Sequence, residues 1–185
     1  MQDNPNTHSL TAEEHWWGFA QLPEETDYPT GTDDNPLTLV CQFAYGEGLL
    51  SVFADLDYFF GDQDAESGHM GEWDKAFYRV VYSPALADLR LHEIRYADGT
   101  PAVPEAEPLE APAHRGEASH IWGDPECFTN EVRQDWPGYR LLLQLDESDE
   151  LGLRFYDCGS LFFLIRPEDL GAGRFERTKC ALYSY

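Results

Sequence analysis

The apolar residues of this 185-residue chain come in short runs, and this spacing is the strongest constraint on its fold. Runs rich in β-branched and aromatic side chains occupy residues 37–43, 49–55 and 77–82. Short runs bounded by Gly, Asp and Pro predict strands, because helices are usually longer and repeat their apolar residues every three to four positions. The sequence Ala-Tyr-Gly-Glu-Gly at 44–48 predicts a hairpin turn. We therefore expect a β-rich fold in which regular helix is scarce.

The rest of the chain continues this pattern around a proline-rich segment. Residues 85–96 are compatible with a short helix or a further strand, and residues 98–118, with four prolines, predict a linker or long surface loop. Residues 1–36 predict an irregular, partly ordered arm, and residues 61–71 an acidic loop. Further strands are expected at 120–128, 139–146, 151–156, 159–165 and 175–183.

Length and composition predict one domain. With 42% hydrophobic and 14% aromatic residues, the chain can form a sizeable core. We expect a single domain over residues 1–185, with an acidic amino-terminal half (1–97), the linker or loop (98–118) and a carboxy-terminal half (119–185). No apolar stretch is long enough to span a bilayer, and the first six residues do not resemble a secretion signal. The four widely spaced cysteines predict reduced core residues in a cytoplasmic protein, with a bridged pair as the alternative.

Charge is distributed unevenly along the chain. Thirty-five acidic residues against twelve basic ones give a formal net charge of −23, and residues 1–74 contain sixteen carboxylates but no Lys or Arg. A field of this sign repels nucleic acid and anionic lipid and attracts basic proteins. We therefore expect no nucleic-acid or membrane partner. The acidity fits a basic partner, or a housekeeping or halophile-adapted protein without a dedicated partner.

Two stretches of the chain repeat one another. The interval from Gln to Phe is eleven residues in both copies, and the interval from Gln to Asp is thirteen. Equal spacing within strands, with unequal loops, is typical of an ancient duplication. The predicted fold is therefore α+β, predominantly antiparallel β, in one internally duplicated domain. The matching residues are Trp17, Gly18, Gln42, Phe53 and Asp55 in the first copy and Trp122, Gly123, Gln144, Phe155 and Asp157 in the second.

These residues belong to motifs that resemble a known family. The first half contains Trp-Gly-Phe-Ala-Gln-Leu-Pro at 17–23 and Val-Cys-Gln-Phe at 40–43; the second contains His-Ile-Trp-Gly-Asp-Pro at 120–125, Leu-Leu-Leu-Gln-Leu-Asp at 141–146 and Phe-Phe-Leu-Ile at 162–165. In this order they resemble the YwqG-like family of bacterial domains of unknown function. The resemblance implies a β-rich, duplicated α+β fold without established enzymatic activity. It also implies a setting beside polymorphic toxins, where small cytosolic proteins serve as immunity factors.

The sequence contains no recognisable catalytic or metal-binding motif. Gly-x-Ser-x-Gly, Walker and Gly-x-Gly-x-x-Gly patterns are missing, and the six histidines are scattered. The acidic residues at 55–66 lack the Gly and Glu spacing of an EF-hand. Asp55 and Asp157 would form an acid-base pair if buried together, but such residues more often cap turns or pair with Arg. We expect no catalytic residue, no metal and no cofactor.

The sequence supports two specific hypotheses about function, and each predicts its own set of binding residues. In the leading hypothesis the protein is an immunity-type inhibitor that binds and neutralises a basic cognate toxin. The residues of its binding face are Trp16, Trp17, Asp55, Asp57, Asp62, Asp64 and Glu66. The alternative is an enzyme or small-ligand-binding protein with a pocket between the two halves. The residues of that pocket are Gln42, Trp122, Gln144 and Asp157.

Overall fold

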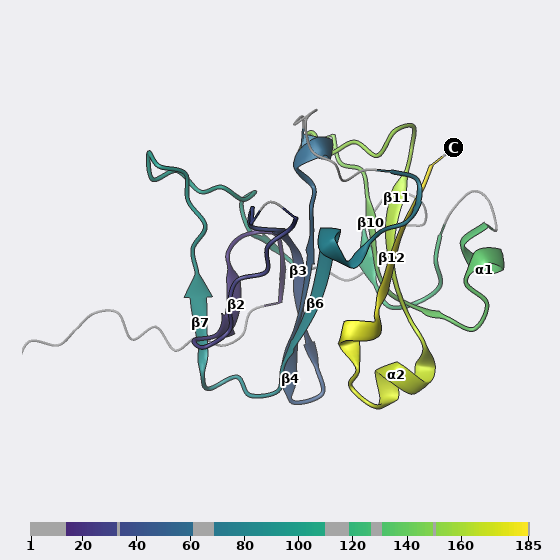
Figure 1. Ribbon diagram of the computed structural model, residues 1–185, viewed down its shortest axis with the longest axis horizontal. Coiled ribbons are helices and arrows are strands. Elements are labelled where there is room, and N and C mark those ends of the chain that lie inside the picture. Colours follow the sequence, from purple (N-terminus) through teal and green to yellow (C-terminus); the bar gives the residue numbers. More distant parts are fainter. Residues whose placement is uncertain are drawn as a thin grey trace, which may run out of the picture.

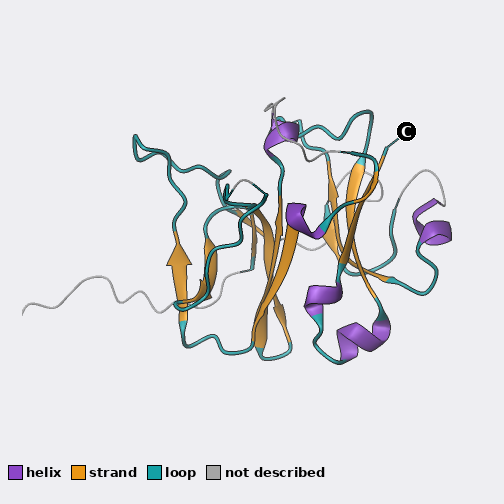
Figure 2. Ribbon diagram, in the orientation of Figure 1, coloured by secondary structure: helices purple, strands orange, loops and turns teal. Residues whose placement is uncertain are grey.

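Antiparallel strands dominate the structure. The computed structural model describes residues 14–32, 34–60, 69–109, 119–126, 131–149 and 151–184. Within these ranges, helix is limited to two short α-helices and three 3-10 helical turns (Figure 2). The strands form two five-stranded sheets and one two-stranded sheet. The predicted predominance of antiparallel β-structure is confirmed.

The first sheet has the strand order β6-β4-β3-β1-β8. β3 and β4 form the predicted hairpin, in which Tyr45 pairs with Gly48. Gly46, in the turn, has a φ of 60°, a left-handed conformation that glycine adopts without strain. The strands are β1 (His15–Trp16), β3 (Thr38–Tyr45), β4 (Gly48–Ala54), β6 (Tyr78–Ser83) and β8 (Glu107–Pro108).

The second sheet has the strand order β5-β12-β11-β10-β9. β5 comes from the amino-terminal half of the chain, yet it pairs with β12, where Glu72 lies opposite Ala181. Each sheet therefore contains one short strand from outside its own half. The strands are β5 (Gly71–Glu72), β9 (His120–Ile121), β10 (Arg140–Asp146), β11 (Ser160–Ile165) and β12 (Lys179–Tyr183).

Several predicted strands are wrong or too long. In the segment 151–156 the structure has an isolated bridge between Ser148 and Leu153 and no strand. Gly152 and Tyr156 adopt φ angles of 69° and 60°, and left-handed residues interrupt an extended strand. The strand predicted at 120–128 ends at Ile121, and the last strand begins only after the 3-10 turn η3 (Phe175–Arg177).

The amino-terminal arm is more ordered than predicted. It contains β1 and β2 (Ala20–Pro23), and β2 pairs with β7 (Leu89–His92) in the two-stranded sheet. The 85–96 segment is therefore a strand rather than a helix. Residues 1–13, the acidic residues 61–68 and linker residues 110–118 lie outside the described part of the chain.

The elements stack in layers (Figure 1). The two large sheets pack face to face, β2 and β7 cover the outer face of the first sheet, and α1 (Glu131–Asp135) covers the outer face of the second. α2 (Pro167–Gly171) and η3 lie at one end of the interface between the large sheets. Burying both faces of a sheet requires apolar residues at successive positions, rather than at every second position.

β11 illustrates this double burial. Leu161, Phe163 and Ile165 point into the core between the two sheets. Phe162 and Leu164 point to the other face, where they pack with Val132 of α1. The uninterrupted apolar run at 161–165 is therefore one strand that is covered on both sides.

A lysine joins the two sheets at one edge. Lys75, in the 3-10 turn η2 (Lys75–Phe77), donates a hydrogen bond to the backbone oxygen of Thr178 (2.5 Å) and lies 4.4 Å from the ring centroid of Tyr78. The Tyr78 hydroxyl donates to the same oxygen at 2.9 Å. Burial lowers the pKa of Lys75 to about 8, and the neighbouring charges of Lys179 and Arg79 act in the same direction. The folded state therefore disfavours the charged form of Lys75.

This pKa predicts a pH dependence of stability. Between pH 8 and 10.5 the unfolded chain holds a proton on Lys75 that the folded chain has released, so raising the pH favours folding. We expect the free energy of unfolding of the wild type to rise relative to that of Lys75→Met across this range. Urea unfolding of both proteins from pH 7 to 10.5 measures the difference. Lys75→Arg, whose charge does not titrate here, should show no such rise; a wild-type curve parallel to that of Lys75→Met would contradict the assignment.

Candidate functional site

Both halves contain a Trp-Gly turn with the same backbone conformation. The φ angles are 59° and 76° for Trp17 and Gly18, and 60° and 92° for Trp122 and Gly123. The Trp17 N–H donates to the Val40 oxygen, and the Trp122 N–H donates to the Leu142 oxygen, both at 3.1 Å. A left-handed tryptophan is unfavourable by about 1–3 kcal/mol and persists only where its surroundings hold it.

A buried glutamine holds the chain after each turn. Gln42 donates from Nε2 to the Gln21 oxygen (2.9 Å) and accepts at Oε1 from the Gln21 N–H (2.8 Å). Gln144 makes the same two bonds to the backbone of Glu126, both at 2.9 Å. Each amide thus pairs with a backbone as a neighbouring strand would, and it satisfies groups that would be costly to bury alone. We call these two arrangements the glutamine clamps.

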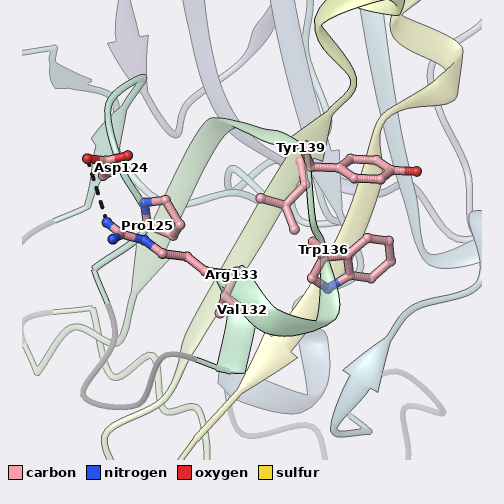
Figure 3. A pocket seen from close by; sticks show the side chains of 8 residues that line it. Asp124, Pro125, Val132, Arg133, Trp136 and Tyr139 are labelled. Carbon is pink, nitrogen blue, oxygen red and sulfur yellow. Dashed lines mark ion pairs between the residues drawn. The ribbon is translucent and has the colours of Figure 1, made fainter.

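The chain between the second Trp-Gly turn and the second clamp forms one wall of a pocket. Trp122-Gly123 leads into Asp124 and Pro125, and Gln144 holds the next residue, Glu126. A pocket of about 260 Å³ lies between this wall and α1, on the outer face of the second sheet (Figure 3). Its lining residues are Asp124, Pro125, Val132, Arg133, Trp136, Gly138, Tyr139 and Leu164.

Charged and aromatic groups lie at opposite sides of this pocket. Arg133 and Asp124 form an ion pair of 3.6 Å on one side (Figure 3). On the other side the rings of Trp136 and Tyr139 meet edge to face, with centroids 5.2 Å apart. The guanidinium group of Arg166 lies 4.6 Å from the centroid of the Tyr139 ring. The pocket therefore offers both charges of an exposed ion pair beside an aromatic surface.

The aromatic side is fixed by a short hydrogen-bond chain. Trp136 Nε1 donates to the Tyr183 hydroxyl (3.0 Å), which donates to Asp135 Oδ2 (2.9 Å). Burial, together with the bond to Asp135, raises the pKa of Tyr183 to about 12. The Tyr183 hydroxyl therefore stays protonated and able to donate at neutral pH.

The residues predicted for the toxin-binding face have different environments. Trp17 is only 3% exposed and belongs to the core between the sheets, so its prediction as an exposed anchor is wrong. Trp16 is half-buried against the same core. Asp55 is half-buried and Asp57 is exposed, and each has an interaction within the chain. Asp62, Asp64 and Glu66 lie outside the described residues.

The four residues predicted for a pocket between the halves are not brought together. Gln42 and Gln144 form the two clamps, on different sheets. Trp122 packs against Phe43 in the core, with ring centroids 5.6 Å apart. Asp157 is exposed, and its backbone N–H donates to Ser184 Oγ at 3.1 Å. Among the described residues, apolar side chains from both large sheets pack into one cluster across this interface.

The equal intervals of the sequence repeat do not all mark equivalent positions. Gln42 pairs with Ser51, whereas Gln144 pairs with Phe162. Phe53 therefore lies within β4, but Phe155 precedes β11 by several residues. Sequence reasoning also missed the pocket over α1, although Asp124 and Pro125 stand in the motif at 120–125. The contribution of Arg133 and Trp136 depends on tertiary packing and has no comparable signal.

No group of three or more His, Cys, Asp or Glu side chains in the described residues is placed to hold a metal ion. Cys41 and Cys180 are free and buried, as predicted, whereas Cys158 is free and exposed; Cys127 is not described. No described helix has the length and apolarity needed to cross a membrane.

A comparison with family models finds a match over the part of the chain that contains the pocket. A family model, described as a domain of unknown function (DUF1963), matches residues 99–183. The matched stretch includes the second Trp-Gly turn, the Gln144 clamp and every residue that lines the pocket. A search of curated proteins finds no match to the chain.

The glutamine clamps predict a clear loss of stability on substitution. Gln144→Leu leaves the N–H and the oxygen of Glu126 without their partner, which should lower the free energy of unfolding by about 2–4 kcal/mol. Chemical denaturation followed by tryptophan fluorescence measures the change. Gln134→Leu, at an exposed position of α1, is the matched control and should change stability by less than about 0.5 kcal/mol. Equal effects of the two substitutions would contradict the role of the clamp.

Proposed function

We propose that this protein works by binding a basic protein, as an immunity-type inhibitor that neutralises a cognate antibacterial toxin. The observation that carries the proposal is the charge distribution. The described residues up to 74 include ten carboxylates, nine of them exposed, and the first basic residue is Lys75. An excess of exposed negative charge accelerates encounter with a basic partner.

The basic residues offset only part of the acidic charge of the chain. Seven of the eleven described Lys and Arg residues form ion pairs with its carboxylates, and two of these, Arg90 and Lys179, pair with Glu24 and Glu72 of the amino-terminal set. Each pair neutralises a carboxylate together with a cation, and the net charge of −23 remains. The seven are Arg90, Arg95, Arg133, Arg154, Arg174, Arg177 and Lys179.

The pocket over α1 supports a second candidate function, the binding of a small ligand. Its volume of about 260 Å³ is close to the lower end of ligand pockets, which typically measure about 300–1,000 Å³. A compact ligand with one charged and one aromatic part matches the Arg133–Asp124 pair and the Trp136 ring. A metabolite that raises the melting temperature of the wild type, but not of Trp136→Ala, would favour this function.

Internal duplication is part of the same proposal. The series β6-β4-β3-β1 and β12-β11-β10-β9 have the same order and pairing. The register of β3 shifts between Leu39 and Cys41, and that of β10 shifts between Leu141 and Leu143. Together with the Trp-Gly turns and the glutamine clamps, these matches support descent from one ancestral half.

Charge reversal at two locations tests the proposed inhibitor. The first variant carries Asp57→Lys, Asp62→Lys, Asp64→Lys and Glu66→Lys; its control carries Glu131→Lys, Asp157→Lys, Glu168→Lys and Glu176→Lys at exposed positions of the second half. Both change the net charge from −23 to −15, because each of four reversals adds two. We expect only the first to slow association by about tenfold or more and to abolish protection.

The partner for this test is a protein that is captured at low salt from native lysate and is toxic when expressed alone. Association rates come from surface plasmon resonance, and protection comes from co-expression. Full protection by the first variant, or equal losses in both, would overturn the acidic amino-terminal face as the binding site.

A further inference from the structure

In the first half, the outer edge of β1 is covered by the chain's own residues 104–109. His15 lies opposite Pro108, and Trp16 lies opposite Glu107. The Gly18 N–H donates to the Pro104 oxygen (3.1 Å), and the Leu109 N–H donates to the Glu14 oxygen (3.3 Å). We call residues 104–109 the covering segment.

The covering segment approaches Gly18 very closely. A Cβ atom added to Gly18 would lie 2.6 Å from the Cβ of Ala106 and 3.2 Å from its Cα. Only glycine leaves room for a backbone at this distance, and the φ of 76° also favours glycine. Gly18 is therefore required by the strand that lies against it.

In the second half, the corresponding edge of β9 is open in the part of the chain that the structure describes. β9 pairs with β10 as β1 pairs with β3, with His120 opposite Gln144 and His15 opposite Gln42. By this register Gly123 corresponds to Gly18, and Ser119 to Glu14. No described backbone group accepts from the Gly123 N–H or donates to the backbone oxygen of Ser119. The Ser119 hydroxyl oxygen accepts from the Asp146 N–H at 3.1 Å. Nor does any described residue come within 4 Å of a Cβ built at Gly123.

From this comparison we infer that the β9 edge is a docking site for an extended segment of a partner protein, which binds as the covering segment binds β1. The Gly123 N–H would donate to a backbone oxygen of the partner, and the backbone oxygen of Ser119 would accept from a backbone N–H of the partner. A small residue of the partner would face Gly123, in the place that Ala106 has against Gly18. Strand addition to an exposed edge is a common mode of recognition.

The negative charge of this chain favours a basic segment as the occupant. This choice rests on the proposed function, in which the partner is a basic protein. The carboxylate of Asp124 follows Gly123 directly and is 86% exposed, although it also forms the 3.6 Å ion pair with Arg133. The covering segment itself carries Glu105 and Glu107, which a chain of net charge −23 would repel if they came from another molecule. A second copy of this chain is disfavoured by the same repulsion. We therefore expect Lys or Arg at the positions of these two glutamates.

A peptide derived from the covering segment tests the docking site. The probe is the acetylated amide Val-Pro-Lys-Ala-Lys-Pro-Leu, which is residues 103–109 with Glu105→Lys and Glu107→Lys. It is added to the isotope-labelled full chain, and amide hydrogen exchange is followed by NMR. In the free protein, the Gly123 amide should exchange at least about tenfold faster than the Gly18 amide. Saturating peptide should slow Gly123 by about tenfold or more and leave Gly18 unchanged.

Two variants and a modified peptide make the result specific. Gly123→Ala places a Cβ where the docked backbone would lie and should weaken peptide binding by about tenfold. Gly99→Ala is the matched control, because Gly99 has a φ of 88° against 92° for Gly123 and equally open surroundings. It should bind the peptide as the wild type does. A peptide N-methylated at its leucine cannot donate to Ser119 and should lose binding.

Several results would overturn the inference. In the free protein, such a result is a Gly123 amide that is already as protected from exchange as Gly18. With peptide, it is the absence of binding at millimolar concentration, or binding that leaves Gly123 exchange unchanged. Peptide binding that Gly99→Ala weakens as much as Gly123→Ala would count in the same way. Self-association that protects Gly123 without peptide would also do so. If the peptide does not bind, but neutralisation of the toxin still depends on charge, the docking edge alone would be refuted. Peptide protection of Gly123, with neutralisation insensitive to charge reversal, would refute the proposed function alone.

Discussion

Contact between the inner faces of the two large sheets determines where every other element of the structure lies. Each sheet presents an apolar face, and removing both faces from water provides the main driving force for folding. β10 and β11 carry apolar residues on their outer faces as well, and these need α1 as a cover. The pocket over α1 exists because this short helix covers only part of the second sheet.

The sequence was most informative where burial is simple. The runs at 37–43, 77–82 and 161–165 became strands, because short apolar stretches between turn residues have few other ways to bury themselves. The two-residue strands β1 and β9 have no such apolar run, because pairing with neighbouring strands, rather than their own sequence, keeps them extended. The core is the usual place of a tryptophan in a small domain, but the left-handed turn and the bond to the Val40 oxygen that hold Trp17 there have no sequence signal. The segment at 151–156 has strand-like composition, but left-handed residues interrupt it.

Functional residues were harder to predict than strands for a physical reason. Gln42 and Gln144 stood out as polar residues in apolar runs, and their backbone bonds explain them as scaffold. The pocket depends instead on Arg133, Trp136 and Tyr139, which line it together with Asp124 only after α1 packs on the second sheet. The edge of β9, open among the described residues, is visible only by comparison with β1, because an unpaired backbone group has no side-chain signature.

The origin of two short strands limits how this architecture can evolve. β8, within the matched stretch 99–183, lies on the first sheet, and β5, from before it, lies on the second. A recombination breakpoint between residues 73 and 106 would separate each of these strands from its sheet. Neither half could then be moved onto another protein with its large sheet complete.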